Sequence, residues 1–179
     1  MKYQEILQRF QYEDESDIFQ RLKNVDKTDF GQNRNIINQI VLWKLNRSVN
    51  VSDDTLEELN SLGYLKSPLE SLKDKKVKSL IGKLLSSKGI KLAVASAILH
   101  FYYPEIFPII DQRSYRELYD KEFPVYLDKN RREKYANMYL KYIKDCYEYQ
   151  QCNCPEVPFS YIDKILYQID KEKGNKVRY

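Results

Sequence analysis

KGIKLAVASAILHFYYPEIFPIID, residues 88–111, is the stretch that decides the fold of this chain. It opens on a tight turn at Gly89-Ile90-Lys91 and continues as an apolar helix with small residues spaced along it. The helix breaks at Pro104, and an apolar loop then ends on a single carboxylate, Asp111. A short turn at a helix N-terminus points free backbone N–H groups at a phosphate. A carboxylate held beside that phosphate, at the rim of an apolar pocket, would act on the sugar of a bound nucleotide.

The same stretch resembles the hairpin-to-aspartate segment of the helix-hairpin-helix DNA glycosylase superfamily. This superfamily includes endonuclease III, the adenine–mispair glycosylases and the 8-oxoguanine glycosylases. Its members carry a Gly-Val-Gly hairpin, an Ala-Ser or Ala-Asp pair, an apolar helix and a final Pro-Val-Asp. The corresponding residues here are Gly89-Ile90-Lys91, Ala95-Ser96 and Pro108-Ile109-Ile110-Asp111. The chain departs from the pattern in two places: Lys91 replaces the second hairpin glycine, and Ala93 stands where bifunctional members carry a nucleophilic lysine.

This resemblance implies an all-α, two-lobed fold that contains a helix-hairpin-helix. One lobe would hold residues 31–110 and the other residues 1–30 plus 112–179, with Asp111 in the cleft between them. The implied activity is that of a monofunctional DNA glycosylase, because Ala93 offers no amine and Asp111 would stabilise the positive charge that develops on the sugar. The implied partner is double-stranded DNA, bound by a monomer. The residues expected at the DNA backbone are Lys88, Gly89, Ile90, Lys91 and Arg113.

Two further segments are similar to a little-described branch of the same superfamily. One is Trp43-Lys44-Leu45-Asn46-Arg47, and the other is the final helix with its Ile-Asp-Lys-x-Leu-Tyr pattern, which ends at Tyr167. The candidates for the base pocket are Trp43, Lys44, Arg47, Tyr102 and Tyr103. The alternative interpretation of the first segment puts Trp43 in a core and the two cations in solvent at a helix C-terminus, where the helix dipole favours them.

Composition limits the class of protein and the kind of partner that this chain can have. The chain has 179 residues, 42% of them hydrophobic, which is enough to bury a sizeable core. Its formal net charge of +4 is compatible with a polyanionic partner without being diagnostic of one. No run approaches 18 apolar residues, and the first residues lack a signal-peptide core, so we expect a cytoplasmic protein that does not enter a membrane.

The cysteines do not indicate a metal centre. Cys146, Cys152 and Cys154 lie close together in the sequence, but the iron–sulfur loop of the superfamily needs four thiolates. The single histidine, His100, is far away in sequence, and we expect it to be packed or solvent-facing rather than catalytic. We therefore expect neither a metal nor a cofactor.

Apolar residues recur at helical spacing through most of the chain. The pattern predicts helices over residues 2–11, 15–24, 35–45, 52–62, 68–85 (one helix or two), 91–103, 111–120, 129–150 and 159–173. No series of strands is indicated.

Alternatives to the enzyme remain open. Asp111 begins a predicted helix, so it could serve simply as its N-cap; Arg113 and Arg116 could bind phosphates or pair with Glu117 and Asp120. A non-catalytic DNA-binding module of the same fold would keep the hairpin and use Asp111 only as a cap. A helical protein-interaction scaffold would bind no nucleic acid at all.

Overall fold

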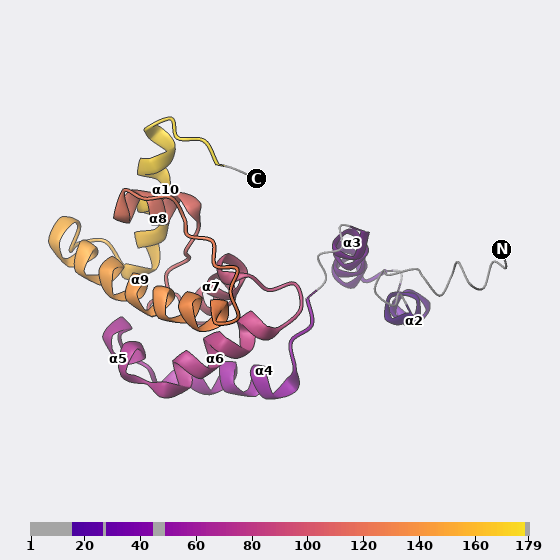
Figure 1. The fold of residues 1–179 in the computed structure, drawn as a ribbon. Helices are drawn as coiled ribbons and strands as arrows, with labels where there is room; N and C mark the ends of the chain where they lie inside the picture. The colour runs from indigo at the N-terminus through magenta and orange to yellow at the C-terminus, as the bar shows by residue number, and fades with distance from the viewer. Residues whose placement is uncertain (1–15, 27, 45–48, 178–179) are drawn as a thin grey trace. The chain divides into compact units, whose positions relative to one another are not determined.

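The computed structural model describes residues 16–26, 28–44 and 49–177 (Figure 1). In these residues the chain forms helices and no strand, so the prediction of an all-α protein is confirmed. The predicted helix over residues 2–11 lies outside the described residues. The helices in chain order are α2 (Ser16–Asn24), α3 (Phe30–Lys44), α4 (Asp53–Asn60), the 3-10 turn η1 (Ser61–Tyr64), α5 (Pro68–Lys73), α6 (Lys75–Ser86), α7 (Leu92–Tyr102), α8 (Gln112–Tyr119), α9 (Arg131–Asn153), the 3-10 turn η2 (Phe159–Tyr161) and α10 (Ile162–Glu172).

The predicted segment 68–85 is two helices, and local capping explains the break between them. Ser67 caps α5 through Glu70 N–H, and Pro68 occupies the first turn, where its missing N–H costs nothing. Asp74 then ends α5 in an extended conformation, and its side chain accepts a hydrogen bond from Lys76 N–H at 2.8 Å to start α6. An aspartate that caps the next helix therefore separates the two.

Two compact units make up the chain, residues 1–50 and residues 51–179. This boundary differs from the lobes predicted from the sequence, which were residues 31–110 and residues 1–30 plus 112–179. The physical reason is a continuous core, which runs from Leu59 through the hairpin helices to Leu166 and so joins residues on both sides of Asp111.

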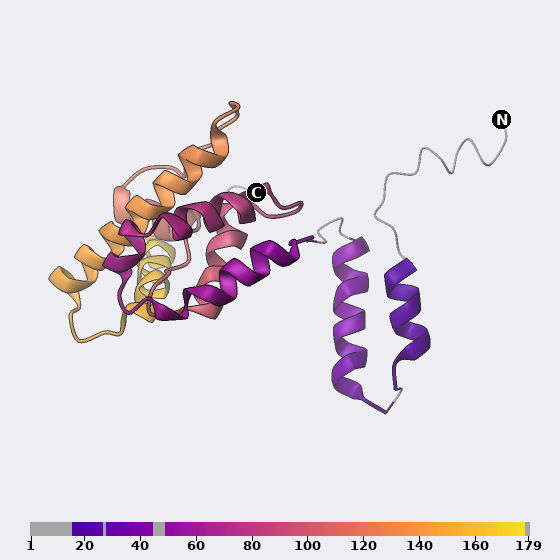
Figure 2. The same cartoon turned by 90° about the horizontal axis from the view of Figure 1, so that it is seen from below.

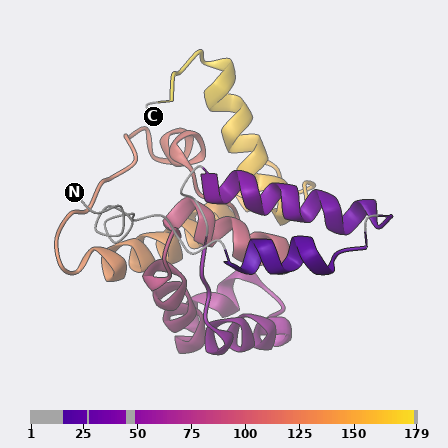
Figure 3. The same ribbon diagram turned by 90° about the vertical axis from the view of Figure 1, so that its right-hand side faces the viewer.

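The first unit contains α2 and α3, which lie side by side and antiparallel (Figures 2 and 3). Among its described residues, Ile36 is the hydrophobic side chain that is buried. Several large apolar side chains on these helices are exposed instead: Phe19, Leu22, Phe30, Ile37, Ile40, Val41 and Leu42. In the described residues, this helix pair therefore lacks an extensive core of its own.

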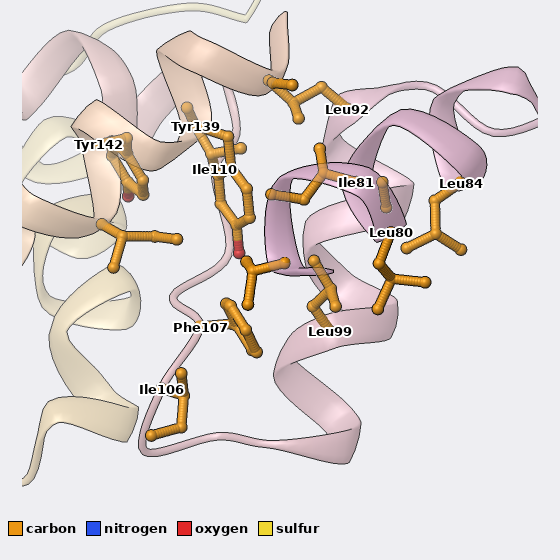
Figure 4. Close-up of a cluster of buried hydrophobic side chains, with 14 of the residues drawn as sticks. Leu80, Ile81, Leu84, Leu92, Leu99, Ile106, Phe107, Ile110, Tyr139 and Tyr142 are labelled. Carbon is orange, nitrogen blue, oxygen red and sulfur yellow. The ribbon is translucent and has the colours of Figure 1, made fainter. Parts of the chain in front are cut away.

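The second unit is organised around α9, which packs on α5 and α6 and also on α8 and α10 (Figure 1). Its buried side chains recur every three or four residues and so form one helical stripe: Ala136, Tyr139, Tyr142, Ile143, Cys146 and Gln150. In Figure 4, Tyr139 and Tyr142 of this stripe lie in the same buried cluster as Leu80, Ile81 and Leu84 of α6 and the loop that follows α7. The loop and the hairpin helices therefore share one core with α9.

The predicted hairpin is formed by α6 and α7, with residues 87–91 as the turn. Gly89 adopts a φ of 79°, in the left-handed region that glycine enters without a steric penalty. Ile90 is 5% exposed and anchors the turn in the core, whereas Lys88 and Lys91 on either side of it are exposed. The turn thus presents backbone and lysines to solvent while one apolar side chain holds it in place.

The two glycines of the hairpin allow a matched stability test. Gly89→Ala should lower the free energy of unfolding by about 1 kcal/mol, because a Cβ is strained at positive φ. Gly82→Ala should raise it by about 0.5–1 kcal/mol, because Gly82 lies inside α6 and no atom is within 4 Å of an added Cβ. Urea denaturation followed by circular dichroism measures both. Equal effects of the two substitutions would contradict this account of the turn.

Candidate functional site

Asp111 is the N-cap of α8. Its Oδ1 atom accepts hydrogen bonds from the N–H groups of Arg113 and Ser114, each at 2.8 Å. Ser114 Oγ in turn accepts the Asp111 N–H at 3.0 Å, which completes a capping box. The N-cap interpretation of Asp111 is therefore confirmed. Both capping bonds use Oδ1, so Oδ2 is the carboxylate oxygen that takes no part in them.

The loop that leads to Asp111 is buried although it has no regular secondary structure. Ile106, Phe107, Pro108 and Ile110 are all buried. A buried loop needs a hydrogen-bonding partner for each backbone polar group that it withdraws from water. Side chains from three helices supply partners for the carbonyl groups of residues 107–109 and for the N–H groups of residues 109 and 110.

Three of these side chains donate to carbonyl oxygens of the loop. They are His100 Nδ1 to Phe107 O at 2.8 Å, Tyr139 OH to Pro108 O at 2.9 Å, and Tyr142 OH to Ile109 O at 3.0 Å. Because a carbonyl only accepts, this bond assigns the donor hydrogen of His100 to Nδ1. His100 is 6% exposed, so it is a packed residue, one of the two alternatives that the sequence left open. Figure 4 shows the Tyr139 hydroxyl pointing at the loop.

Two further side chains accept hydrogen bonds from the loop. Asp163 Oδ2, on α10, accepts the Ile109 N–H at 3.1 Å. Ser96 Oγ, on α7, accepts the Ile110 N–H at 3.1 Å. The two residues before Asp111 are thus bonded to two different helices.

The bond to Ser96 also relates Asp111 to the hairpin. Ser96 lies five residues beyond Lys91, the N-cap of α7. That separation corresponds to roughly 7.5 Å along a helix axis. The residue before Asp111 is therefore attached to the second turn of the helix that the hairpin starts.

The N-terminus of α7 has no side-chain cap at Lys91. Its first helical bond runs from Ala95 N–H to Lys91 O, so the N–H groups of Leu92, Ala93 and Val94 precede the helical ladder. Ala93 and Val94 are exposed at this end of the helix. The predicted contact residues Lys88, Gly89 and Lys91 are exposed beside them, and Ile90 is the buried anchor.

Arg113 and Arg116 project from α8 onto Asp170 of α10, instead of pairing with Glu117 and Asp120. Arg116 donates two hydrogen bonds to the carboxylate of Asp170, from Nε to Oδ1 at 2.7 Å and from a second nitrogen to Oδ2 at 2.8 Å. Arg113 adds a bond at 3.1 Å, and its guanidinium lies 5.4 Å from the centre of the Tyr167 ring. The Asp170 side chain is fully buried, and its hydrogen bond to Arg116 holds its pKa below the usual range.

The aromatic candidates on α7 separate into two environments. Tyr103 is half-buried, and its hydroxyl donates to Leu59 O at 2.6 Å, so it belongs to the packing of the unit. Tyr102 is 49% exposed, and its neighbour Phe101, which the sequence interpretation did not single out, is 81% exposed. Helical periodicity could have identified Phe101 as exposed, because the buried positions of α7 fall on the other face of the helix. These positions include Leu92, Ser96 and Leu99.

The other predicted pocket residues lie in the first unit or outside the described residues. Trp43 is partly buried and Lys44 exposed, both in the last turn of α3. Arg47 lies outside the described residues. The structure describes each unit by itself, so the assignment of Trp43, Lys44 and Arg47 to a base pocket stays a prediction.

Cysteines and acidic residues form no metal-binding group of three or more in the part of the chain that the structure describes. Cys146 is buried in α9, Cys152 is exposed and Cys154 is partly buried; all three are free thiols. None of the described helices has both the length and the apolar character that crossing a membrane requires.

Comparison with known proteins adds no relative: no protein-family model, no curated protein sequence and no solved structure matches the chain. The similarity to DNA glycosylases therefore depends on the quoted residues themselves.

The ion-pair network on α8 and α10 predicts a pH-dependent stability. Asp170→Asn should lower the free energy of unfolding at pH 7 by about 3 kcal/mol, because it leaves two guanidinium groups without their buried carboxylate. The folded-state pKa of Asp170 is lowered, so this stabilisation is present above about pH 4 and is lost as the pH falls through the lowered value. The gap between wild type and Asn variant should therefore narrow on acidification, as measured by urea denaturation at a series of pH values.

Asp128→Asn is the control for this experiment. Asp128 pairs with Lys134 at the surface, and solvent screens that pair. Its removal should have far less effect than that of Asp170 at every pH. A pH-independent difference between wild type and Asp170→Asn would contradict the assigned charge pairing.

Proposed function

We propose that this protein is a monofunctional DNA glycosylase, with Asp111 as its catalytic carboxylate and the α6–α7 hairpin as its DNA-backbone contact. The observation that carries the proposal is the hydrogen bond from the N–H of Ile110, the residue before Asp111, to Ser96 of the hairpin helix. In the proposed complex the hairpin binds a phosphate, and the carboxylate of Asp111 meets the sugar of the same strand.

The chemistry follows from the charge that develops as the base leaves. Breaking the bond between C1′ and the base leaves positive charge on the sugar, and a pre-positioned carboxylate stabilises that charge. Oδ1 is held by two N–H groups of α8, so we assign Oδ2 to the sugar and to the attacking water. Water then adds to C1′, its proton passes to the departing base, and the products are a free base and an abasic site.

The absence of an amine at position 93 limits the reaction to hydrolysis. Members of the resembled superfamily that cut the strand use a lysine at that position to form a Schiff base. Ala93 is exposed at the first turn of α7 and cannot do so. Lys91 is the N-cap residue two positions earlier, and we assign its ammonium group to a DNA phosphate.

In the proposed complex the hairpin contacts phosphate without reading sequence. The N–H groups at the start of α7 and the side chains of Lys88 and Lys91 meet the backbone. The target base leaves the duplex, at a cost that is smallest for a damaged or mispaired base. We place Arg113 in the Asp170 network rather than at the DNA, and we retain Tyr102, Trp43, Lys44 and Arg47 as candidates for base stacking and contact.

A non-catalytic DNA-binding module of the same glycosylase-like fold is the second candidate. The specific observation in its favour is the capping box, which gives Asp111 a complete structural role without any chemistry. The exposed apolar side chains of α2 and α3 favour the third candidate, a protein-interaction scaffold. Base release and duplex binding, measured on the same panel of oligonucleotides, distinguish the three.

Asp111→Asn should separate the structural role of this residue from its chemistry. Asparagine caps helices as well as aspartate does, so the free energy of unfolding should change little. Base release from duplexes carrying deaminated, oxidised, alkylated or mispaired bases should fall by at least about 100-fold, whereas duplex affinity stays the same or increases. Asp111→Ala should also lower the free energy of unfolding by about 1 kcal/mol, because it removes the cap.

Both variants are compared with wild type by product analysis and by urea denaturation. Base release at the wild-type rate from Asp111→Asn would remove this carboxylate from the chemistry. If wild type releases no base yet binds duplex DNA, the second candidate holds instead.

Lys91→Glu should weaken duplex binding to every sequence tested and lower the slope of log K against log salt by about one. The reason is that a phosphate-contacting lysine releases a counterion when it binds. Fluorescence anisotropy at several salt concentrations measures both quantities. Lys171→Glu on α10 is the matched control, since α10 packs mainly on α8, α9 and η2. An unchanged slope in Lys91→Glu would exclude Lys91 from the interface.

A further inference from the structure

We infer that Asp163 is the positioning residue for Asp111, acting through the loop of residues 107–110. This inference rests on the proposed function and names a residue that it does not otherwise use. Asp163 lies in the first turn of α10, and its link to the loop joins residues 54 positions apart in the chain.

The geometry of Asp163 is that of a buried acceptor with two donors. Its Oδ2 takes the Ile109 N–H at 3.1 Å, and its Oδ1 takes the Lys164 N–H of its own helix at 2.9 Å. The residue is 4% exposed. One carboxylate therefore bonds the loop and the N-terminus of α10 at the same time.

This arrangement imposes a cost on the fold. Burial raises the pKa of Asp163, and the nearby His100 opposes that effect only in part. A raised folded-state pKa means that the fold disfavours the ionised form of Asp163 relative to the unfolded chain. An acid that the fold holds in an unfavourable environment, at a fixed point of contact, is typical of a functional position.

The loop depends on such bonds because no helix or sheet holds it. Ile109 is bonded to α10 through Asp163, and the next residue, Ile110, is bonded to α7 through Ser96. Asp111 follows immediately and begins α8. Two N–H groups of the loop, bonded to acceptors on α10 and α7, thus help to set the position of the Asp111 carboxylate relative to the hairpin, and the bond to Asp163 spans the greater distance in sequence.

Asp163→Asn tests the bond with almost no change of volume. Both carboxylate oxygens accept from backbone N–H groups, so either orientation of the amide places its NH2 group against a donor. Asp163→Ala removes both acceptors and serves as the second variant. Asp145→Asn is the control, because Asp145 is a partly buried aspartate of α9 that bonds Tyr119 and Lys141.

Four quantities are measured on the full chain. They are the single-turnover rate of base release from the same duplex panel, the affinity for a duplex with a stable abasic-site analogue, the urea midpoint, and the amide hydrogen exchange of residues 109–113. We expect Ile109 to exchange roughly 10-fold faster in the variants and base release to fall by about 100-fold, with unchanged affinity. The midpoint of Asp163→Asn should stay close to wild type, because removal of the buried charge offsets the lost bond.

Base release at the wild-type rate in a variant whose Ile109 amide exchanges faster would overturn the inference. A loss of base release that follows a fall in the urea midpoint would also overturn it, because a purely structural role predicts that parallel. If Asp163→Asn keeps both the slow exchange of Ile109 and the rate of base release, the same two measurements on Asp163→Ala test the inference. If wild type releases no base from any duplex, the proposed function fails, and unchanged exchange of residues 109–113 in the variants would separately refute the bond as a positioning contact.

Discussion

The second unit depends on the side-chain hydrogen bonds that hold the buried loop between α7 and α8. A loop of this kind removes its carbonyl and N–H groups from water, and each unpaired group would cost about 1–3 kcal/mol. Here α7, α9 and α10 each contribute at least one bond to residues 107–110. Without them these groups would be left unpaired inside the core around Phe107 and Ile110.

Asp111 combines two roles that are often assigned to different residues. As an N-cap it stabilises α8, and one of its oxygens is enough for that. As a proposed catalytic group it needs a fixed carboxylate whose second oxygen is available, and the capping bonds provide that fixation. Stability and the proposed activity thus favour the same geometry at this position, whereas burial raises the pKa of Asp163, the acceptor that bonds the loop to α10.

Much of the local structure could be predicted from the sequence, because it depends on neighbouring residues. Helical periodicity predicted most of the helices, and Gly89 predicted the turn of the hairpin. The aspartate that precedes the polar helix α8 predicted its N-cap. The partners of the loop could not be predicted in the same way. Tyr139 and Asp163 reach it from 31 and 54 residues away, and nothing in the local pattern distinguishes them from other tyrosines and aspartates. The partner of Arg113 was wrongly predicted for the same reason, because the sequence offered nearer carboxylates than that of Asp170.

The contribution of α10 has a consequence for how the protein is made. Synthesis proceeds from the N-terminus, so the hairpin and the loop leave the ribosome well before residues 163–170 exist. Until α10 arrives, the Ile109 N–H lacks its carboxylate and the arginines of α8 lack Asp170. The nascent chain can therefore form the hairpin early, but the loop before Asp111 gains its bond to α10 only after translation has passed the start of the last helix. A product interrupted before α10 would contain the turn without the contacts of Asp163 and Asp170.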